Sequence, residues 1–210
     1  MISIDTILQQ ATALNLKGFK ESLLLQIQDA NYGTLSFEER LYHLFESEIN
    51  QRDNKKIKRL LQAATLKDKT ASLEQIEYLP KRNLDKSVIM SLATGNFINL
   101  KQNVLITGAT GVGKSFTMQC LGKRAIDLGY PTKYYRLSSL LEEIRTSRIA
   151  GTYTKTLAKI SKFKLLLIDD FGVTPLKADE INDLFEIIED RTFNGSIIIT
   201  AQLPIKDWHA

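Results

Sequence analysis

A glycine-rich stretch that ends in a lysine and a serine carries the clearest chemical signal in this chain of 210 residues. The segment from Gly108 to Ser115 reads GATGVGKS and fits the pattern G-x-x-x-x-G-K-[ST] without a mismatch. Loops of this type turn backbone N–H groups toward phosphate oxygens, while the lysine reaches the β- and γ-phosphates and the hydroxyl ligates magnesium. The pattern therefore predicts a site for ATP and Mg²⁺, with nucleotide contacts from Gly108, Ala109, Thr110, Gly111, Val112, Gly113, Lys114, Ser115 and Phe116.

Two adjacent carboxylates follow an apolar run further along the chain. The run Leu165–Ile168 reads as a buried strand, and Asp169 and Asp170 come directly after it. Ligands of open α/β sheets bind at the carboxyl ends of strands, so we expect Asp169 to hold magnesium and Asp170 to orient or deprotonate the attacking water. Taken alone, such a pair is more often a solvated turn, and the upstream loop is what favours the functional interpretation. A small-molecule kinase shares the loop, but the second acid suits water activation better.

The last strand expected in the sequence ends in Thr200, Ala201 and Gln202. If this strand lies between the strands that carry the loop and the acids, Thr200 or Gln202 can contact the γ-phosphate or the attacking water. The other interpretation of Thr200 is an ordinary hydroxyl satisfied at a strand end. The resulting candidates are, for catalysis, Lys114, Asp170 and Thr200 and, for magnesium, Ser115 and Asp169.

Strand and helix patterns alternate after about residue 85, which is the arrangement needed to position these side chains. Short apolar runs predict strands, and longer amphipathic stretches predict the helices between them. The alternation is typical of a parallel sheet with helices on both faces, so the fold class expected is α/β, of the P-loop NTPase type. Strands are expected at 103–107, 132–136, 164–168 and 196–200, and helices at 85–97, 114–128, 138–149, 151–161 and 178–193.

The first 70 residues read as a small all-helical module without a strand pattern. Ser36 and Glu39 have the spacing of a capping box, which predicts a helix beginning there. The apolar side chains of that helix, including Phe37, Phe45 and Ile49, recur at helical spacing and are expected to face inward.

A second, basic helix is expected to follow, because lysines and arginines gather between residues 51 and 69. Cations at this density can neutralise phosphates, so the stretch is a candidate for nucleic-acid binding. A solvated helix face explains the same charges equally well. The candidate contacts are Lys55, Lys56, Lys58 and Arg59.

Composition and charge narrow the class of protein. The net charge of +4 and the isoelectric point near 9.0 are only weak evidence for an anionic partner. The N-terminus has no signal-peptide pattern, and no apolar run approaches the roughly 20 residues of a membrane span. Cys120 is the only cysteine, so no internal disulfide can form, and core packing is its expected role. A cytoplasmic protein without a membrane partner is the simplest prediction.

Motifs beyond the phosphate-binding loop resemble the IstB helper ATPases of insertion sequences, within the AAA+ group that includes DnaC helicase loaders and DnaA. The resemblance covers nearly the whole chain and is clearest from 71 to 208. Asp170 stands where most AAA+ proteins carry glutamate, which is typical of the IstB and DnaC branch. The remaining motifs are Ala71–Ile76 leading to Pro80, Leu92–Ile98, Asp169–Gly172, and Ile199–Pro204 followed by Trp208.

The resemblance implies the AAA+ fold and a mechanism. Proteins of this family bind ATP, assemble on double-stranded DNA as oligomers, deform it, and present the target site to a partner transposase. For this chain it implies ATP held between subunits, a DNA- or partner-binding module at 1–70, and an ATPase domain at 71–210. It also favours the nucleic-acid interpretation of the basic stretch.

Two alternatives to a transposition helper stay open on the sequence. One is a DnaC-like helicase loader, and the other is a nucleotide-gated DNA-binding scaffold without significant hydrolysis. The chain ends at Ala210, after the fourth expected strand, whereas family members continue through an arginine that completes a neighbour's site, a fifth strand and a helical lid. The ATPase domain is therefore expected to be truncated, to bind nucleotide and to hydrolyse it slowly by itself.

Overall fold

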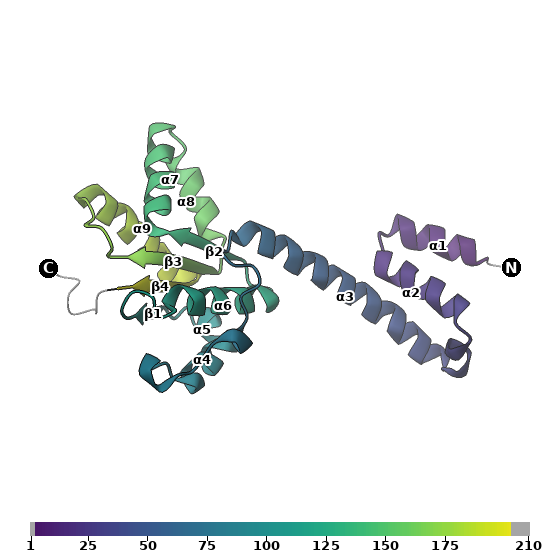
Figure 1. Ribbon diagram of the computed structural model, residues 1–210. Coiled ribbons are helices and arrows are strands. Elements are labelled where there is room, and N and C mark those ends of the chain that lie inside the picture. The colour runs from purple at the N-terminus through teal and green to yellow at the C-terminus, as the bar shows by residue number, and fades with distance from the viewer. Residues whose placement is uncertain (1–2, 203–210) are drawn as a thin grey trace. The chain divides into compact units, whose positions relative to one another are not determined.

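A computed structural model describes residues 3–202 of the chain (Figure 1). It contains two compact units, with the boundary between Arg59 and Leu60. Trp208, part of the expected family motif, lies outside the described residues. Between residues 3 and 202, no helix combines the length and the apolar character that crossing a membrane requires.

The N-terminal unit is built from helices alone within its described residues. Ser3 caps the first helix, because its hydroxyl accepts a hydrogen bond from Thr6 N at 3.3 Å. The capping box expected at the third helix is confirmed: Ser36 N donates to the Glu39 carboxylate at 2.8 Å, and Glu39 N donates to Ser36 Oγ at 3.2 Å. The elements are α1 (Ile4–Ala13), α2 (Lys17–Gln28), the 3₁₀ turn η1 (Ala30–Thr34) and α3 (Phe37–Ala64).

The third helix differs from the prediction in two respects. The two helices expected before and after residue 50 are one continuous helix, α3, because neither glycine nor proline occurs in it. Its aromatic side chains Phe37 and Phe45 were expected to face inward, and this is wrong: they are 72% and 53% exposed. Ile49 is likewise exposed. Helical spacing indicates which side chains share a face, but another element must cover that face to bury them.

The C-terminal unit alternates strands and helices as the sequence predicts. One expected helix, 85–97, is divided in two, because Gly95 adopts a left-handed conformation with φ of 80°. The elements are η2 (Leu73–Gln75), η3 (Pro80–Arg82), α4 (Lys86–Ala93), α5 (Asn96–Asn99), β1 (Val104–Thr107), α6 (Lys114–Asp127), β2 (Thr132–Arg136), α7 (Leu137–Ile149), α8 (Tyr153–Ser161), β3 (Leu165–Phe171), α9 (Ala178–Asn194) and β4 (Ser196–Ala201).

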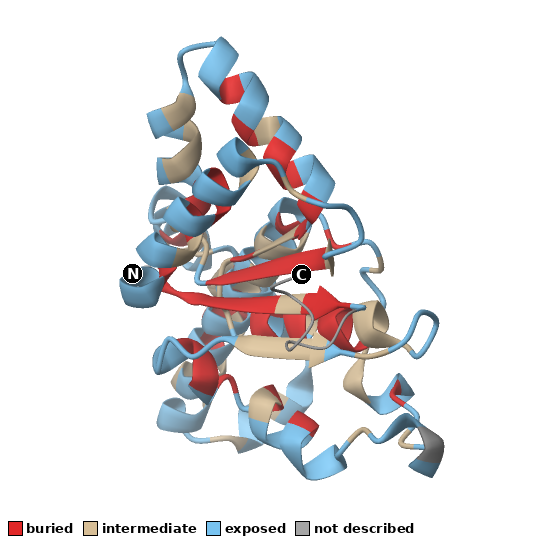
Figure 2. Ribbon diagram, turned by 90° about the vertical axis from the view of Figure 1, so that its left-hand side faces the viewer, coloured by how far each residue is buried: buried red, intermediate tan, exposed pale blue. Residues whose placement is uncertain are grey.

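The four strands form one parallel sheet in the order β1-β4-β3-β2. Leu166 and Ile168 of β3 pack on one face against α7, α8 and α9, whereas α6 packs on the other. Figure 2 shows buried residues concentrated along the strands. The predicted fold class, a parallel α/β sheet covered on both faces, is confirmed.

Helix α6 lies close against the sheet at Gly122. A Cβ atom at this position would overlap with Leu167 Cδ1, so a larger residue would require the Leu167 side chain or the helix to shift. Cys120, on the same helix, is buried as expected, and its thiol donates to Ser72 O at 3.1 Å. These contacts hold the middle of α6 against β3 and Ser72, and the glycine-rich loop leads into the start of the same helix.

Candidate nucleotide-binding site

The carboxyl ends of β1, β4 and β3 meet at one edge of the sheet and surround a cavity of about 250 Å³. The glycine-rich loop leaves β1, the acids stand at the end of β3, and Thr200 is near the end of β4. Because β4 lies between β1 and β3, the condition set for Thr200 in the sequence holds. The cavity is lined by Thr110, Gly111, Gly113, Lys114, Ser115, Phe116, Asp170, Thr200, Ala201 and Gln202.

The glycine-rich loop has the backbone geometry that phosphate binding requires. Gly113 precedes α6 with φ of 92°, a conformation that disfavours other residues, and no side chain caps this helix start. The first N–H groups of α6 therefore remain available to an anion at the cavity. Lys114 Nζ lies over the loop and donates to the carbonyl oxygens of Gly108 and Ala109 at 2.7 and 2.8 Å.

Asp169 is the centre of the polar network in the site. The residue is 2% exposed, and its Oδ1 accepts hydrogen bonds from Ser115 Oγ at 2.8 Å, from Asp170 N at 3.1 Å and from Thr200 Oγ1. Its Oδ2 accepts a hydrogen bond from Tyr134 OH at 3.1 Å. A carboxylate and a hydroxyl in direct contact are oxygen ligands of the kind Mg²⁺ prefers, so Ser115 and Asp169 fit this ion.

Asp170 occupies a strained turn beside the cavity. Its φ is 62°, and the pairing of β3 with β4 is irregular between Ile168 and Phe171. This bulge turns Asp170 N–H toward Thr200 Oγ1, at 3.3 Å, and leaves the carboxylate 39% exposed at the cavity. Arg136 Nε forms an ion pair with Asp170 Oδ2 at 2.9 Å. The two adjacent acids therefore have different environments, one buried and saturated, the other exposed and paired.

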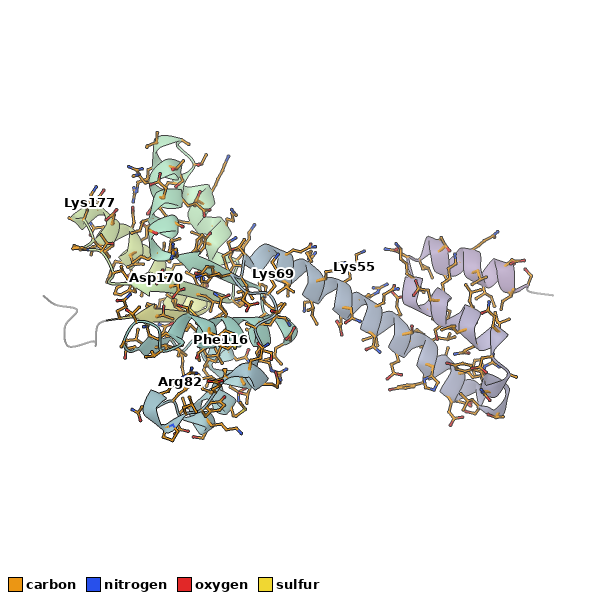
Figure 3. The ribbon with its side chains drawn as sticks, in the orientation of Figure 1. Lys55, Lys69, Arg82, Phe116, Asp170 and Lys177 are labelled. Carbon is orange, nitrogen blue, oxygen red and sulfur yellow. The ribbon has the colours of Figure 1, made fainter. Side chains whose placement is uncertain are left out.

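Tyr134, Arg136 and Arg82 are near the site although the sequence alone did not indicate them. Tyr134 and Arg136 belong to β2, which pairs with β3 in a register that sets Arg136 opposite Asp169. Arg82 Nη1 lies 4.0 Å from the position that a Cβ of Gly113 would take. Only the strand order would have revealed the first two, since β2 precedes β3 by a long connection. Figure 3 labels Asp170, Phe116 and Arg82 in this unit.

A larger cleft of about 900 Å³ lies beside Asp170, between α7 and the start of α9. Arg136 and Asp170 line it together with Lys177, which is labelled in Figure 3. Most of its charged side chains are paired within the cleft, for example Arg145 with Glu142 at 2.7 Å. Asp170 thus lines both the nucleotide cavity and this larger, charged cleft.

The sequence offers two interpretations of Arg145 and Arg191, both on helices: contacts to a neighbouring subunit or DNA, or the simple solvation that is usual for helix arginines. Arg145 is exposed. Arg191 is 1% exposed, so both interpretations are wrong for it: its guanidinium donates to the carbonyl oxygens of Ser196, Ile160 and Phe163 at 3.3, 3.4 and 2.6 Å. Burial lowers its pKa to about 10. Arg191, near the end of α9, therefore links this helix to the end of α8 and to the start of β4.

The four basic candidates for nucleic acid lie on α3 in the N-terminal unit. All are exposed, and among the described residues none forms an ion pair with a carboxylate. Helical spacing aligns Lys55, Lys56 and Arg59 on one side, and Figure 3 shows Lys55 extending from the helix. These four residues belong to the N-terminal unit, whereas the nucleotide cavity belongs to the C-terminal unit.

The sheet order, the loop between β1 and α6 and the strand-end acids define an ATP-binding protein of the AAA+ P-loop class. The profile of the family "IstB-like ATP binding protein" matches residues 9–210. The chain belongs to this family, as the sequence resemblance predicted.

Individual relatives agree with this assignment. A Pseudomonas fluorescens protein named as an ATP-binding protein of insertion sequence IS1162 is 38% identical over 94% of this chain and 85% of its own length. The corresponding protein of IS21 from Pseudomonas aeruginosa is 26% identical over 99% and 77%.

Solved structures show the same fold. A DnaC helicase loader covers 65% of this chain and 80% of its own, with a TM-score of 0.54 and 18% identity. AMPPCP-bound DnaA from Aquifex aeolicus covers 66% and 44%, with a TM-score of 0.59 and 22% identity. At these identities the likeness concerns the fold alone.

Proposed function

We propose that the chain binds ATP together with Mg²⁺ and hydrolyses it. The observation that carries this proposal is the 2.8 Å hydrogen bond between Ser115 Oγ and Asp169 Oδ1 at the edge of the nucleotide cavity. It joins the two elements, loop and strand end, that a triphosphate and its metal must share. Ser115 and Asp169 would hold the ion, directly or through water, and the ion would neutralise charge on the phosphates.

The remaining candidates have separate roles in this proposal. Lys114 would exchange its carbonyl partners for phosphate oxygens, since the ammonium forms stronger hydrogen bonds with charged acceptors. Asp170 would orient the attacking water and accept its proton. Thr200 would contact the γ-phosphate or that water from the central strand. The backbone N–H groups of 108–116 would bind the phosphates, as the loop geometry permits.

The test is ATP turnover and nucleotide binding in Asp170→Asn, with Asp179→Asn as a matched control in the first turn of α9. Removal of the proposed base is expected to lower turnover about 10²- to 10⁴-fold while a fluorescent ATP analogue binds as before. The control should turn over ATP like the wild type. Equal turnover in Asp170→Asn would contradict the role of this residue. A wild-type chain that binds nucleotide without turnover, with or without DNA, would favour the nucleotide-gated scaffold instead.

For the biological role, we propose an ATP-dependent helper of DNA transposition that assembles on double-stranded DNA and stimulates a partner transposase. Support comes from relatives named for insertion sequences. We also propose the division of labour expected from the sequence, with residues 1–70 binding DNA or the partner and 71–210 acting as the ATPase. A helicase loader is the second candidate, because the DnaC loader shares the fold. Affinity capture with the transposase of the same element, compared with a replicative helicase, distinguishes these partners.

The proposed DNA contact is tested by exchanging Lys55, Lys56, Lys58 and Arg59 together for glutamine. Loss of four phosphate contacts should reduce the slope of log K against log salt by about 3 to 4 for duplex DNA. The matched control removes four exposed lysines of the C-terminal unit, Lys86, Lys101, Lys162 and Lys177. An equal loss in the control would show that overall charge, rather than α3, determines the affinity. Sedimentation with and without ATP tests the proposed self-association.

A further inference from the structure

Tyr134 reaches the metal-binding carboxylate from a neighbouring strand. It pairs in register with Leu167, two residues before Asp169 on β3. Two residues along a strand span roughly 6.6 Å, which is close to the length of a tyrosine side chain. The Tyr134 side chain therefore reaches the level of Asp169 on β3, where its OH donates to Asp169 Oδ2 at 3.1 Å.

This hydrogen bond leaves the two oxygens of Asp169 with different roles. Oδ2 is held by Tyr134, whereas Oδ1 faces Ser115, the other proposed metal ligand. Burial, followed by the charge of Asp169 and the hydrogen bond to it, raises the pKa of Tyr134. The hydrogen bonds from Ser115 and Tyr134 thus orient the Asp169 carboxylate without an ion.

The backbone of Tyr134 is itself anchored on both sides of its strand. One side pairs with β3, and on the other Tyr134 O accepts a hydrogen bond from Thr65 Oγ1 at 3.1 Å. The preceding residue, Lys133, donates from Nζ to Ala63 O at 3.3 Å, at the end of α3. Although β2 is the edge strand, its position is therefore determined from both directions.

We propose that Tyr134 is a positioning residue that orients Asp169 for a divalent cation, acting through the carboxylate and touching neither the ion nor the nucleotide. This rests on the proposed magnesium–nucleotide site. Hydrogen bonds to a ligating carboxylate commonly affect metal affinity about 10- to 100-fold, so the loss of one hydroxyl should be measurable.

The experiment titrates Mg²⁺ into the full chain in the presence of a fluorescent N-methylanthraniloyl derivative of ATP. In Tyr134→Phe, the Mg²⁺ concentration at half-saturation is expected to rise roughly tenfold. Binding of the same probe in EDTA should stay within about twofold of the wild type. Tyr135→Phe is the matched control, because the Tyr135 side chain is on the opposite face of the sheet in the cluster with Leu166 and Ile168, and it should leave both values unchanged.

A second arm separates positioning from a general effect on folding. In an Asp169→Asn background, Tyr134→Phe should cause no further change in the Mg²⁺ requirement, whereas two independent effects would add. Additivity, or an equal loss of binding with Mg²⁺ and in EDTA, would overturn the role of Tyr134. A wild-type chain that binds the probe without any dependence on Mg²⁺ would refute the proposed metal site itself, which is a distinguishable failure. Circular dichroism confirms that each variant is folded.

Discussion

The two units of the chain differ in how far their large apolar side chains are buried. In the C-terminal unit, Leu165, Leu166, Leu167 and Ile168 are completely buried between two layers of helices. In the N-terminal unit, the large apolar side chains of α3, such as Phe37 and Phe45, are mostly exposed. Since buried apolar area is the main source of stability, the C-terminal unit has a core of its own, whereas the N-terminal unit keeps apolar surface available for contacts.

Both units contain buried carboxylates, and two of these, Glu48 and Asp169, have different uses. Glu48 accepts hydrogen bonds from Gly18 N and Phe19 N at 2.8 and 3.2 Å, and it pairs with Arg52. Asp169 accepts donors just as fully, but its partners are the hydroxyls of a cavity. The first carboxylate therefore joins two helices, and the second is placed where an ion can exchange with its partners. The comparison predicts effects on stability in one case and on ligand binding in the other.

The largest difference is expected between matched truncations of the two apolar surfaces. Leu167→Ala should destabilise the C-terminal unit by about 3 kcal/mol, through lost burial and a cavity beside α6. Phe37→Ala should change the stability of the N-terminal unit by less than about 0.5 kcal/mol, because the side chain is 72% exposed. Urea unfolding, with hydrogen exchange to assign each change to its unit, measures both. A loss above roughly 1 kcal/mol for Phe37→Ala would show that the start of α3 is covered in solution.

A buried arginine gives the next largest effect. Arg191→Met keeps most of the volume but removes the hydrogen bonds of the guanidinium to three carbonyl oxygens, so a loss of about 2 kcal/mol is expected. Arg145→Met, at an exposed position on α7, should cost less than about 0.5 kcal/mol. Thermal unfolding of the two variants tests this pair. Similar behaviour would mean that water replaces the guanidinium at the carbonyl oxygens.

The sequence predicted the C-terminal unit well because its signals are local. A strand buried on both faces must be a short apolar run, as Leu165–Ile168 is, and the glycine-rich loop has a fixed pattern of glycines. From the sequence, the position of β4 between β1 and β3 is only a condition for a role of Thr200, and the strand order meets this condition. These elements could be predicted because the pattern of their own residues is enough to indicate their structure.

The misses depend on contacts between distant segments. The hydrogen bond from Tyr134 to Asp169 requires the strand order that sets β2 beside β3, which no local pattern specifies. Arg191 reads as a solvated charge until the ends of α8, α9 and β4 are brought together around it. On α3, a change from apolar to basic composition suggested two helices, but composition alone does not end a helix.

A third prediction concerns the pH dependence of the N-terminal unit. Burial by itself raises the pKa of Glu48, but the hydrogen bonds from Arg52 and from the backbone of Phe19 and Gly18 outweigh it and hold the pKa below its ordinary value. A lowered pKa stabilises the fold above about pH 4.3, and this contribution is lost as the pH falls through the lowered value. Glu48→Gln should cost about 1 kcal/mol at neutral pH and remove that acid sensitivity.

The measurement is helix content against urea at several pH values between 3 and 7, with Glu38→Gln as the control. Glu38 is exposed in the first turn of α3, so its variant should keep the acid dependence of the wild type. If Glu48→Gln lost stability in parallel with the wild type on acidification, the carboxylate would not be the group responsible. The N-terminal unit would then rely on some other contact between α2 and α3.

The smallest effect is expected from one exposed lysine of α3, and it concerns binding alone. Lys55→Gln should leave the stability of both units within about 0.5 kcal/mol and lower the salt slope of duplex DNA binding by about 0.9, the value for one phosphate contact. Lys101→Gln, exposed before β1, removes the same charge from the other unit and should leave the slope unchanged. Fluorescence anisotropy between 50 and 200 mM salt measures both. Equal slopes for the two variants would mean that DNA is bound through the overall charge, and α3 would lose its distinction from the C-terminal unit.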